Sequence, residues 1–89
     1  MFITITIETM GYGADIRIDA RQKIYEGLKV LRESGKLPLG ASPDFFRSCV
    51  KESLVSAYKT FEEEGIFDGD ILVTVDKIEN EPKDEANNG

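Results

Sequence analysis

The stretch DARQKIYEGLKVLRESG, from Asp19 to Gly35, decides the fold of this chain. Asp19 is expected to cap the first turn of a helix, with Gln22 three residues further on as its capping-box partner. Gly35 supplies the stop signal, and Pro38 prevents an early restart. The apolar and small residues that recur at helical spacing are Ile24, Leu28, Leu31, Ala20 and Gly27. They form one stripe, which needs a sheet to cover it.

Two strands are predicted before this helix. The segment Phe2–Thr9, FITITIET, is rich in β-branched residues and alternates strictly. Its isoleucines, Ile3, Ile5 and Ile7, share the face that is expected to meet the stripe. The glycines of Met10–Gly13 favour a hairpin connection, because glycine tolerates the positive φ of such turns. Ala14–Ile18 then returns as a second strand, with Ile16 and Ile18 inward.

A third and a fourth strand are predicted after the helix. The third is Phe45–Lys51, FFRSCVK, and its inward parity is the one that keeps its arginine and its lysine out of the core. Its inward residues are then Phe46, Ser48 and Val50. Glu52 and Ser53 form a turn in this interpretation, and Leu54–Ala57 forms a short strand or an extended segment.

The last predicted strand is Ile71–Val75, ILVTV, which is apolar at nearly every position. That pattern is typical of a central strand whose two faces are both at least partly covered. Before it, Phe61–Gly65 is predicted to form one helical turn that ends at a left-handed glycine, and Asp68–Asp70 a tight turn. Residues 1–76 are expected to form the domain, and residues 77–89 an acidic disordered tail.

Composition limits the classes of function. A chain of 89 residues builds one modest core, and its net charge of −6 argues against nucleic acid as a partner. With one cysteine and no histidine, it has no ligand set for zinc or an iron–sulfur cluster, and no cofactor is expected. No signal peptide and no apolar run of ~20 residues is evident. We therefore expect a cytoplasmic protein without direct membrane insertion.

This order of elements is that of the ubiquitin-like β-grasp, an α+β fold in which a mixed sheet of four or five strands packs on one helix. Within that fold the chain resembles the small YukD-like (EsaB-like) proteins encoded with Gram-positive type VII secretion systems. The resemblance covers residues 2–75 and is strongest over Gly65–Leu72, GIFDGDIL, with its glycine, isoleucine, Gly-Asp and hydrophobic strand. It implies a non-enzymatic secretion accessory whose partner is a protein, such as a membrane-bound secretion component.

The resemblance also implies which side of the last strand is buried. It turns Leu72 and Thr74 inward, whereas hydrophobicity alone would bury the other three residues, Ile71, Val73 and Val75. Following the resemblance, we expect an apolar cluster on the open sheet face with a basic rim. The cluster comprises Cys49, Ile71 and Val73, and the rim comprises Arg47 and Lys51. The alternative is that these are ordinary strand residues, shielded by the tail or by another copy.

Other residues carry weaker hypotheses. Met10 and Tyr12 could make contacts at the hairpin tip, although an exposed turn explains them equally well. Cys49 is better explained as a small strand hydrophobe than as a reactive thiol, since no histidine is present to activate it. Asp68 and Asp70 match the spacing of no calcium loop. An unprotected sheet edge would allow a homodimer.

The alternative function is a ubiquitin-like covalent modifier or sulfur carrier. Such proteins act through a C-terminal Gly-Gly, whereas this sequence ends in Asn87, Asn88 and Gly89 and contains no Gly-Gly. The sequence therefore favours a non-conjugating interaction module, and it shows no catalytic motif that would indicate an enzyme.

Overall fold

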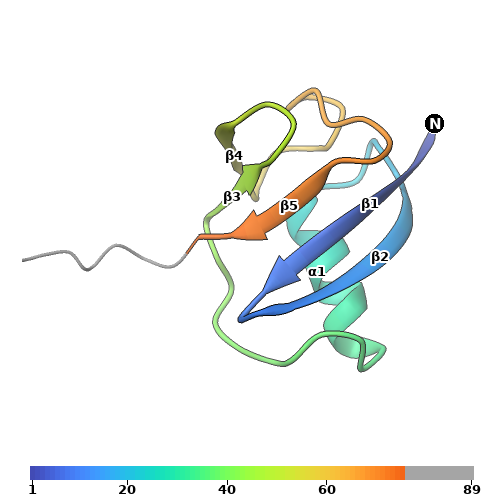
Figure 1. Ribbon diagram of the computed structural model, residues 1–89. Helices are drawn as coiled ribbons and strands as arrows, with labels where there is room; N and C mark the ends of the chain where they lie inside the picture. Colours follow the sequence, from blue (N-terminus) through green and yellow to red (C-terminus); the bar gives the residue numbers. More distant parts are fainter. Residues whose placement is uncertain (76–89) are drawn as a thin grey trace, which may run out of the picture.

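The computed structural model describes residues 1–75, so the predictions made for residues 77–89 lie outside the described residues. Five strands form one sheet, and a single helix packs against one of its faces (Figure 1). The elements are β1 (Phe2–Thr9), β2 (Tyr12–Asp19), α1 (Ile24–Glu33), β3 (Phe45–Ser48), β4 (Ser53–Ser56) and β5 (Ile71–Thr74). The predicted β-grasp arrangement is confirmed.

The last strand lies at the centre of the sheet, as its apolar sequence predicted. The strand order is β2-β1-β5-β3-β4, and β5 runs parallel to β1 and antiparallel to β3. Leu72 pairs with Ile7 on one side and with Ser48 on the other. Leu72 is fully buried, whereas Ile71 and Val73 are half-buried. The orientation implied by the resemblance is therefore confirmed.

The core lies between the helix stripe and the isoleucine face of β1. Ile3, Ile5 and Ile7 are buried, and so are all five residues of the predicted stripe. Gly27 allows the close approach of the two layers, because a Cβ there would lie 3.0 Å from Cδ1 of Ile7. On the edge strand β2, Ile18 is buried but Ile16 is only half-buried.

The helix begins four residues later than predicted, at Ile24, and Asp19 does not cap it. Asp19 ends β2, and its carboxylate accepts hydrogen bonds from the backbone and side chain of Arg21. The first helical N–H groups are satisfied by other backbone, since Ile24 and Tyr25 donate to carbonyl oxygens in segment 57–59. The predicted stop is confirmed, because Gly35 has a φ of +81° and closes the last turn.

The largest differences from the predicted sheet boundaries lie in the hairpin turn and at the end of the third strand. The β1–β2 turn contains only Met10 and Gly11, both at positive φ, as a two-residue hairpin requires. β3 ends at Ser48 rather than at residue 51, because residues 49–52 form a turn that Glu52 closes at a φ of +56°. Val50 is therefore exposed on this turn instead of buried in a strand.

The segment before β5 follows the predicted pattern. Residues 61–65 form a single hydrogen-bonded turn rather than a regular helix. Gly65 ends it in the left-handed conformation, at a φ of +70°. Phe61 and Ile66 from this segment are both buried in the core. Asp68 lies in the tight turn and accepts a hydrogen bond from the backbone N–H of Thr4 at 2.7 Å. The turn is thereby attached to β1.

The orientation of β5 predicts unequal effects of truncation. Leu72→Ala should lower the free energy of unfolding by about 2–5 kcal/mol, because it removes a fully buried side chain. Val73→Ala, on the half-buried face, should lower it by about 1 kcal/mol. Urea denaturation of both variants tests the orientation, and a larger loss for Val73→Ala would contradict it.

The contacts of Asp19 predict a pH effect. The hydrogen bonds from Arg21 hold the pKa of Asp19 well below its usual range. A carboxylate whose pKa is lowered by folding stabilises the protein above its unfolded pKa of about 3.9, and this effect is lost as the pH falls. The stability difference between the wild type and Asp19→Asn should therefore be larger at about pH 7 than at about pH 2.5 in urea denaturation. A difference independent of pH would refute the assignment.

Candidate protein-interaction site

The face of the sheet opposite α1 carries an apolar surface on its short strands. In Figure 1 the helix lies behind the sheet, so this open face is turned toward the viewer. Phe45 on β3 is 48% exposed, and Leu54 on β4 is 53% exposed. We call the cluster over β3, β4 and β5 the sheet-face patch; it consists of Phe45, Arg47, Cys49, Leu54, Ile71 and Val73.

Arg47 lies inside this patch rather than at its rim. The strand register places it directly between Leu54 of β4 and Val73 of β5. On the far side of Val73, the same row continues with Glu8 of β1. Val73 therefore lies between the cation of Arg47 and the anion of Glu8. This row of the sheet offers a partner both an apolar surface and two opposite charges. A partner that covers Val73 would meet both charges.

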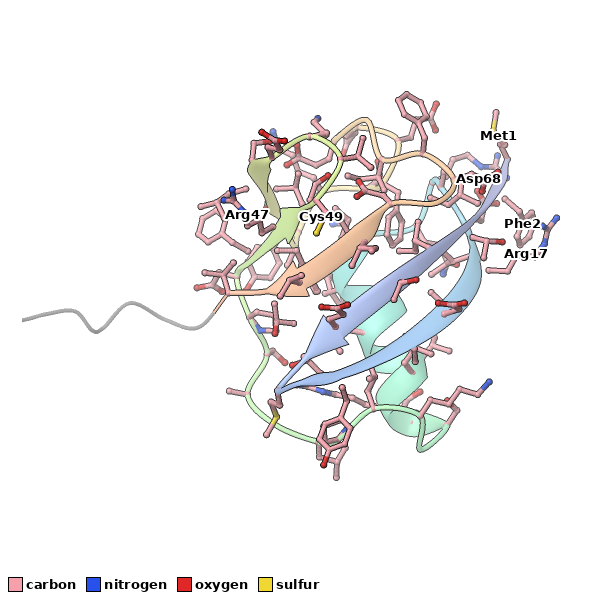
Figure 2. The ribbon with its side chains drawn as sticks, in the orientation of Figure 1. Met1, Phe2, Arg17, Arg47, Cys49 and Asp68 are labelled. Atoms are coloured by element: carbon pink, nitrogen blue, oxygen red, sulfur yellow. The ribbon has the colours of Figure 1, made fainter. Side chains whose placement is uncertain are left out.

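Cys49 and Ile71 form the neighbouring row. The N–H of Cys49 donates to the carbonyl oxygen of Ile71 at 2.9 Å, which places these two residues next to each other, as predicted. Cys49 is not in the middle of a strand, however: it is the first residue after β3, and its thiol is exposed. Figure 2 shows Cys49 beside β5, with Arg47 further along β3.

Lys51, the other predicted rim residue, does not lie on a strand. It lies in the turn after β3, and its ammonium group donates to the carbonyl oxygen of Glu64. The sequence prediction placed Lys51 on a strand in alternation with Cys49, and that strand assignment is wrong because β3 ends at Ser48. The sequence prediction did not include Phe45 and Leu54. Strand alternation could have identified them, because each precedes a residue that faces the core, Phe46 or Val55.

Met10 and Tyr12 are exposed at the hairpin tip, as predicted, but they are separate from the patch. Met10 lies beside loop residues 40–43 and faces a different hollow of the surface. It has a φ of +54°, a conformation that costs a residue with a side chain about 1 kcal/mol. The structure thus brings Cys49, Ile71, Val73 and Arg47 together and leaves the hairpin residues apart.

A buried polar cluster holds the patch in place. Asp70 is only 2% exposed, and its carboxylate accepts hydrogen bonds from Oγ of Ser48 at 2.5 Å and from the N–H of Val50 at 3.1 Å. The N–H of Ile71 donates to the same carboxylate at 2.7 Å. Since buried polar groups need partners, these bonds fix the turn after β3 against the start of β5. The local sequence around Asp70 indicated only a tight turn.

The β1–β2 side of the open face is mostly polar, and the exposed Phe2 is its apolar exception. On β1 and β2, Oγ1 of Thr6 donates to the Asp15 carboxylate at 2.6 Å. The guanidinium of Arg17 lies 5.4 Å from the centre of the Phe2 ring, and Figure 2 shows this pair near the N-terminus. The apolar patch therefore has a polar border on its β1 side, which is the usual anatomy of a protein-binding surface.

Two chemical properties of residues 1–75 bear on other functions. Within this range, no three histidine, cysteine, aspartate or glutamate side chains gather closely enough to hold a metal ion. In the same residues, no helix has the length and apolar character needed to cross a membrane.

Comparison with known proteins identifies the fold but no family. No protein-family model and no curated protein matches the chain. Among solved structures, a designed protein based on ubiquitin is similar, with a TM-score of 0.66 and 18% identity over 92% of this chain and 96% of that one. The ubiquitin-like domain of EccD5 from Mycobacterium xenopi has a TM-score of 0.50 and 21% identity, over 86% of this chain and 98% of that one.

A chain of the ESX-5 inner membrane complex is also similar. The TM-score is 0.50 and the identity is 21%, over 92% of this chain but only 23% of that one. At these identities the likeness concerns the fold alone. The chain has a ubiquitin-like β-grasp fold.

The buried cluster predicts that Asp70 matters more than its neighbour Asp68. Asp70→Ala leaves the Ser48 hydroxyl and the Val50 N–H without their acceptor, and should cost about 2–4 kcal/mol of folding free energy. Asp68→Ala, on the exposed turn, should cost about 1 kcal/mol. Equal losses in urea denaturation would show that the buried cluster is not what holds the turn.

Proposed function

We propose that this protein is a YukD-like, non-enzymatic and non-conjugating interaction module, and that it serves as a cytoplasmic accessory of a type VII secretion system. It would bind a protein partner through the sheet-face patch. The partner we propose is a cytoplasmic segment of a membrane-bound secretion component.

The observation that carries the proposal is the patch itself. Phe45 and Leu54 expose about half of their surface beside Arg47, on short strands with a polar border. Aromatic residues and arginine are enriched where proteins bind one another. A monomer gains nothing from exposing such residues together, whereas a partner that covers them would remove apolar area from water.

The secretion link is supported by two separate likenesses. The sequence GIFDGDIL in residues 65–72 resembles the YukD-like proteins, and the fold resembles the ubiquitin-like domain of EccD5. Both sets of proteins belong to type VII systems. The second likeness concerns the fold and does not indicate a particular partner.

A covalent modifier is the competing function, and it makes a different prediction. A modifier would be recovered from cells partly joined to substrates, and its intact mass under denaturing conditions would increase. An interaction module would keep its own mass and release its partner under the same conditions.

The interaction role predicts a loss of partner binding when a charge is placed in the patch. Val73→Asp should weaken binding to the cytoplasmic segment of the secretion component at least about tenfold, because it replaces apolar contact area by a carboxylate that must lose its hydration on binding. The matched control is Val30→Asp, at a valine of α1 that is 44% exposed and remote from the patch. Isothermal titration calorimetry on folded variants measures both.

The control should bind within about twofold of the wild type. If Val73→Asp binds as well as Val30→Asp, the patch is not the docking surface. If the wild type also gains mass in cells, the non-conjugating function itself is refuted.

A further inference from the structure

A groove lies on the helix side of the sheet, distinct from the sheet-face patch. It lies between α1 and the loop 38–43, is closed by Tyr58, and has a volume of about 560 Å³. Its floor is Leu28 of α1, and its outer wall is Leu39 of the loop. The patch lies on the opposite face of the sheet, so one surface can be occupied while the other is free.

The outer wall is held in place by one side chain. Arg32 donates from Nε to the carbonyl oxygen of Pro38 at 2.9 Å, and from Nη1 to those of Gly40 and Ala41 at 3.1 and 3.3 Å. Three hydrogen bonds from one guanidinium fix a loop that has no strand or helix of its own. The groove is thus preformed, and a ligand would not have to order it.

The apolar part of the groove is exposed to solvent. Leu39 is 77% exposed, and it lines the same groove as the buried Leu28. Tyr25 and Tyr58 form a tilted ring pair with centroids 6.2 Å apart, and the Tyr58 hydroxyl donates to the Asp44 carboxylate at 2.5 Å. An aliphatic wall that faces an oriented aromatic pair is suited to the side chain of a bulky apolar residue.

The charged part of the groove is positive. Lys23, Lys29 and Arg32 line it together with the carboxylate of Glu33, and the Asp44 carboxylate lies at its edge on the Tyr58 hydroxyl. Within the described residues, neither lysine forms an ion pair. A local excess of cations is notable in a chain whose net charge is −6, because the whole molecule otherwise repels acidic ligands.

We propose that this groove binds a short acidic segment of a partner protein that carries a leucine or phenylalanine. The apolar side chain packs between Leu39 and Tyr58, and the flanking carboxylates face Lys23 and Lys29. The proposal does not depend on the sheet-face patch. Together, the two surfaces would let one small domain join two proteins.

The test uses the full chain and a fluorescent acidic peptide with one leucine and one phenylalanine, followed by fluorescence polarisation. Lys29→Glu combined with Lys23→Glu should weaken binding at least about tenfold, since it replaces attraction by repulsion. Arg17→Glu makes the same kind of charge change on the open face and should leave binding within about twofold. Peptide binding should also weaken as salt is added.

The apolar contact is tested separately, with variants that leave the core intact. Leu39→Ser should weaken binding at least about fivefold, while Val50→Ser, at a residue that is 69% exposed elsewhere, should not change it. A peptide with alanine in place of its leucine and phenylalanine should also bind at least about fivefold more weakly to the wild type. In nuclear magnetic resonance spectra, the peptide should shift the amide signal of Leu39 and leave that of Val73 unchanged.

Three results would overturn the proposal. The first is a wild type that does not bind the acidic peptide, and the second is equal binding by all the variants. The third is peptide binding about tenfold tighter when Glu79, Glu81 and Glu85 are changed to glutamine. That result would assign the groove to the chain's own acidic C-terminal segment instead of a partner. None of these results would affect the test of the sheet-face patch.

Discussion

The insertion of β5 between β1 and β3 is the constraint on which the rest of the structure depends. Without it, the β1–β2 hairpin and the β3–β4 pair would be two separate units, each too small to hold a core. Leu72 closes the core from this central position. Its register is set by the buried carboxylate of Asp70, which bonds the turn after β3 and the start of β5.

The same arrangement separates the two faces of the sheet by their chemistry. The helix covers one face, and Gly27 lets it pack close to β1. No element of the described chain covers the other face, so the half-buried Ile71 and Val73 remain accessible beside Arg47. A rigid core with an uncovered apolar strip has the properties of a recognition module, because the surface is preformed and little ordering entropy is lost on binding.

Strand alternation predicted the positions of the candidate-site residues that lie in or next to strands, but not of those beyond the end of β3. The pairing of Cys49 with Ile71, and the outward position of Val73, followed correctly from parity and from the resemblance. The same rule failed for Lys51, because the chain leaves the sheet at Ser48. That end point depends on the hydrogen bonds to Asp70, a residue 22 positions away from Ser48 that local periodicity does not reveal.

What the sequence determined by itself was local periodicity: the isoleucine face of β1, the stripe on α1, and the stop at Gly35. These features depend on residues within a few positions of one another. The start of α1 was decided by tertiary structure, because carbonyl groups of residues 57–59, rather than the Asp19 side chain, satisfy the first helical N–H groups. The groove beside α1 also depends on tertiary structure, because the hydrogen bonds from Arg32 to the loop 38–43 form only when the chain is folded.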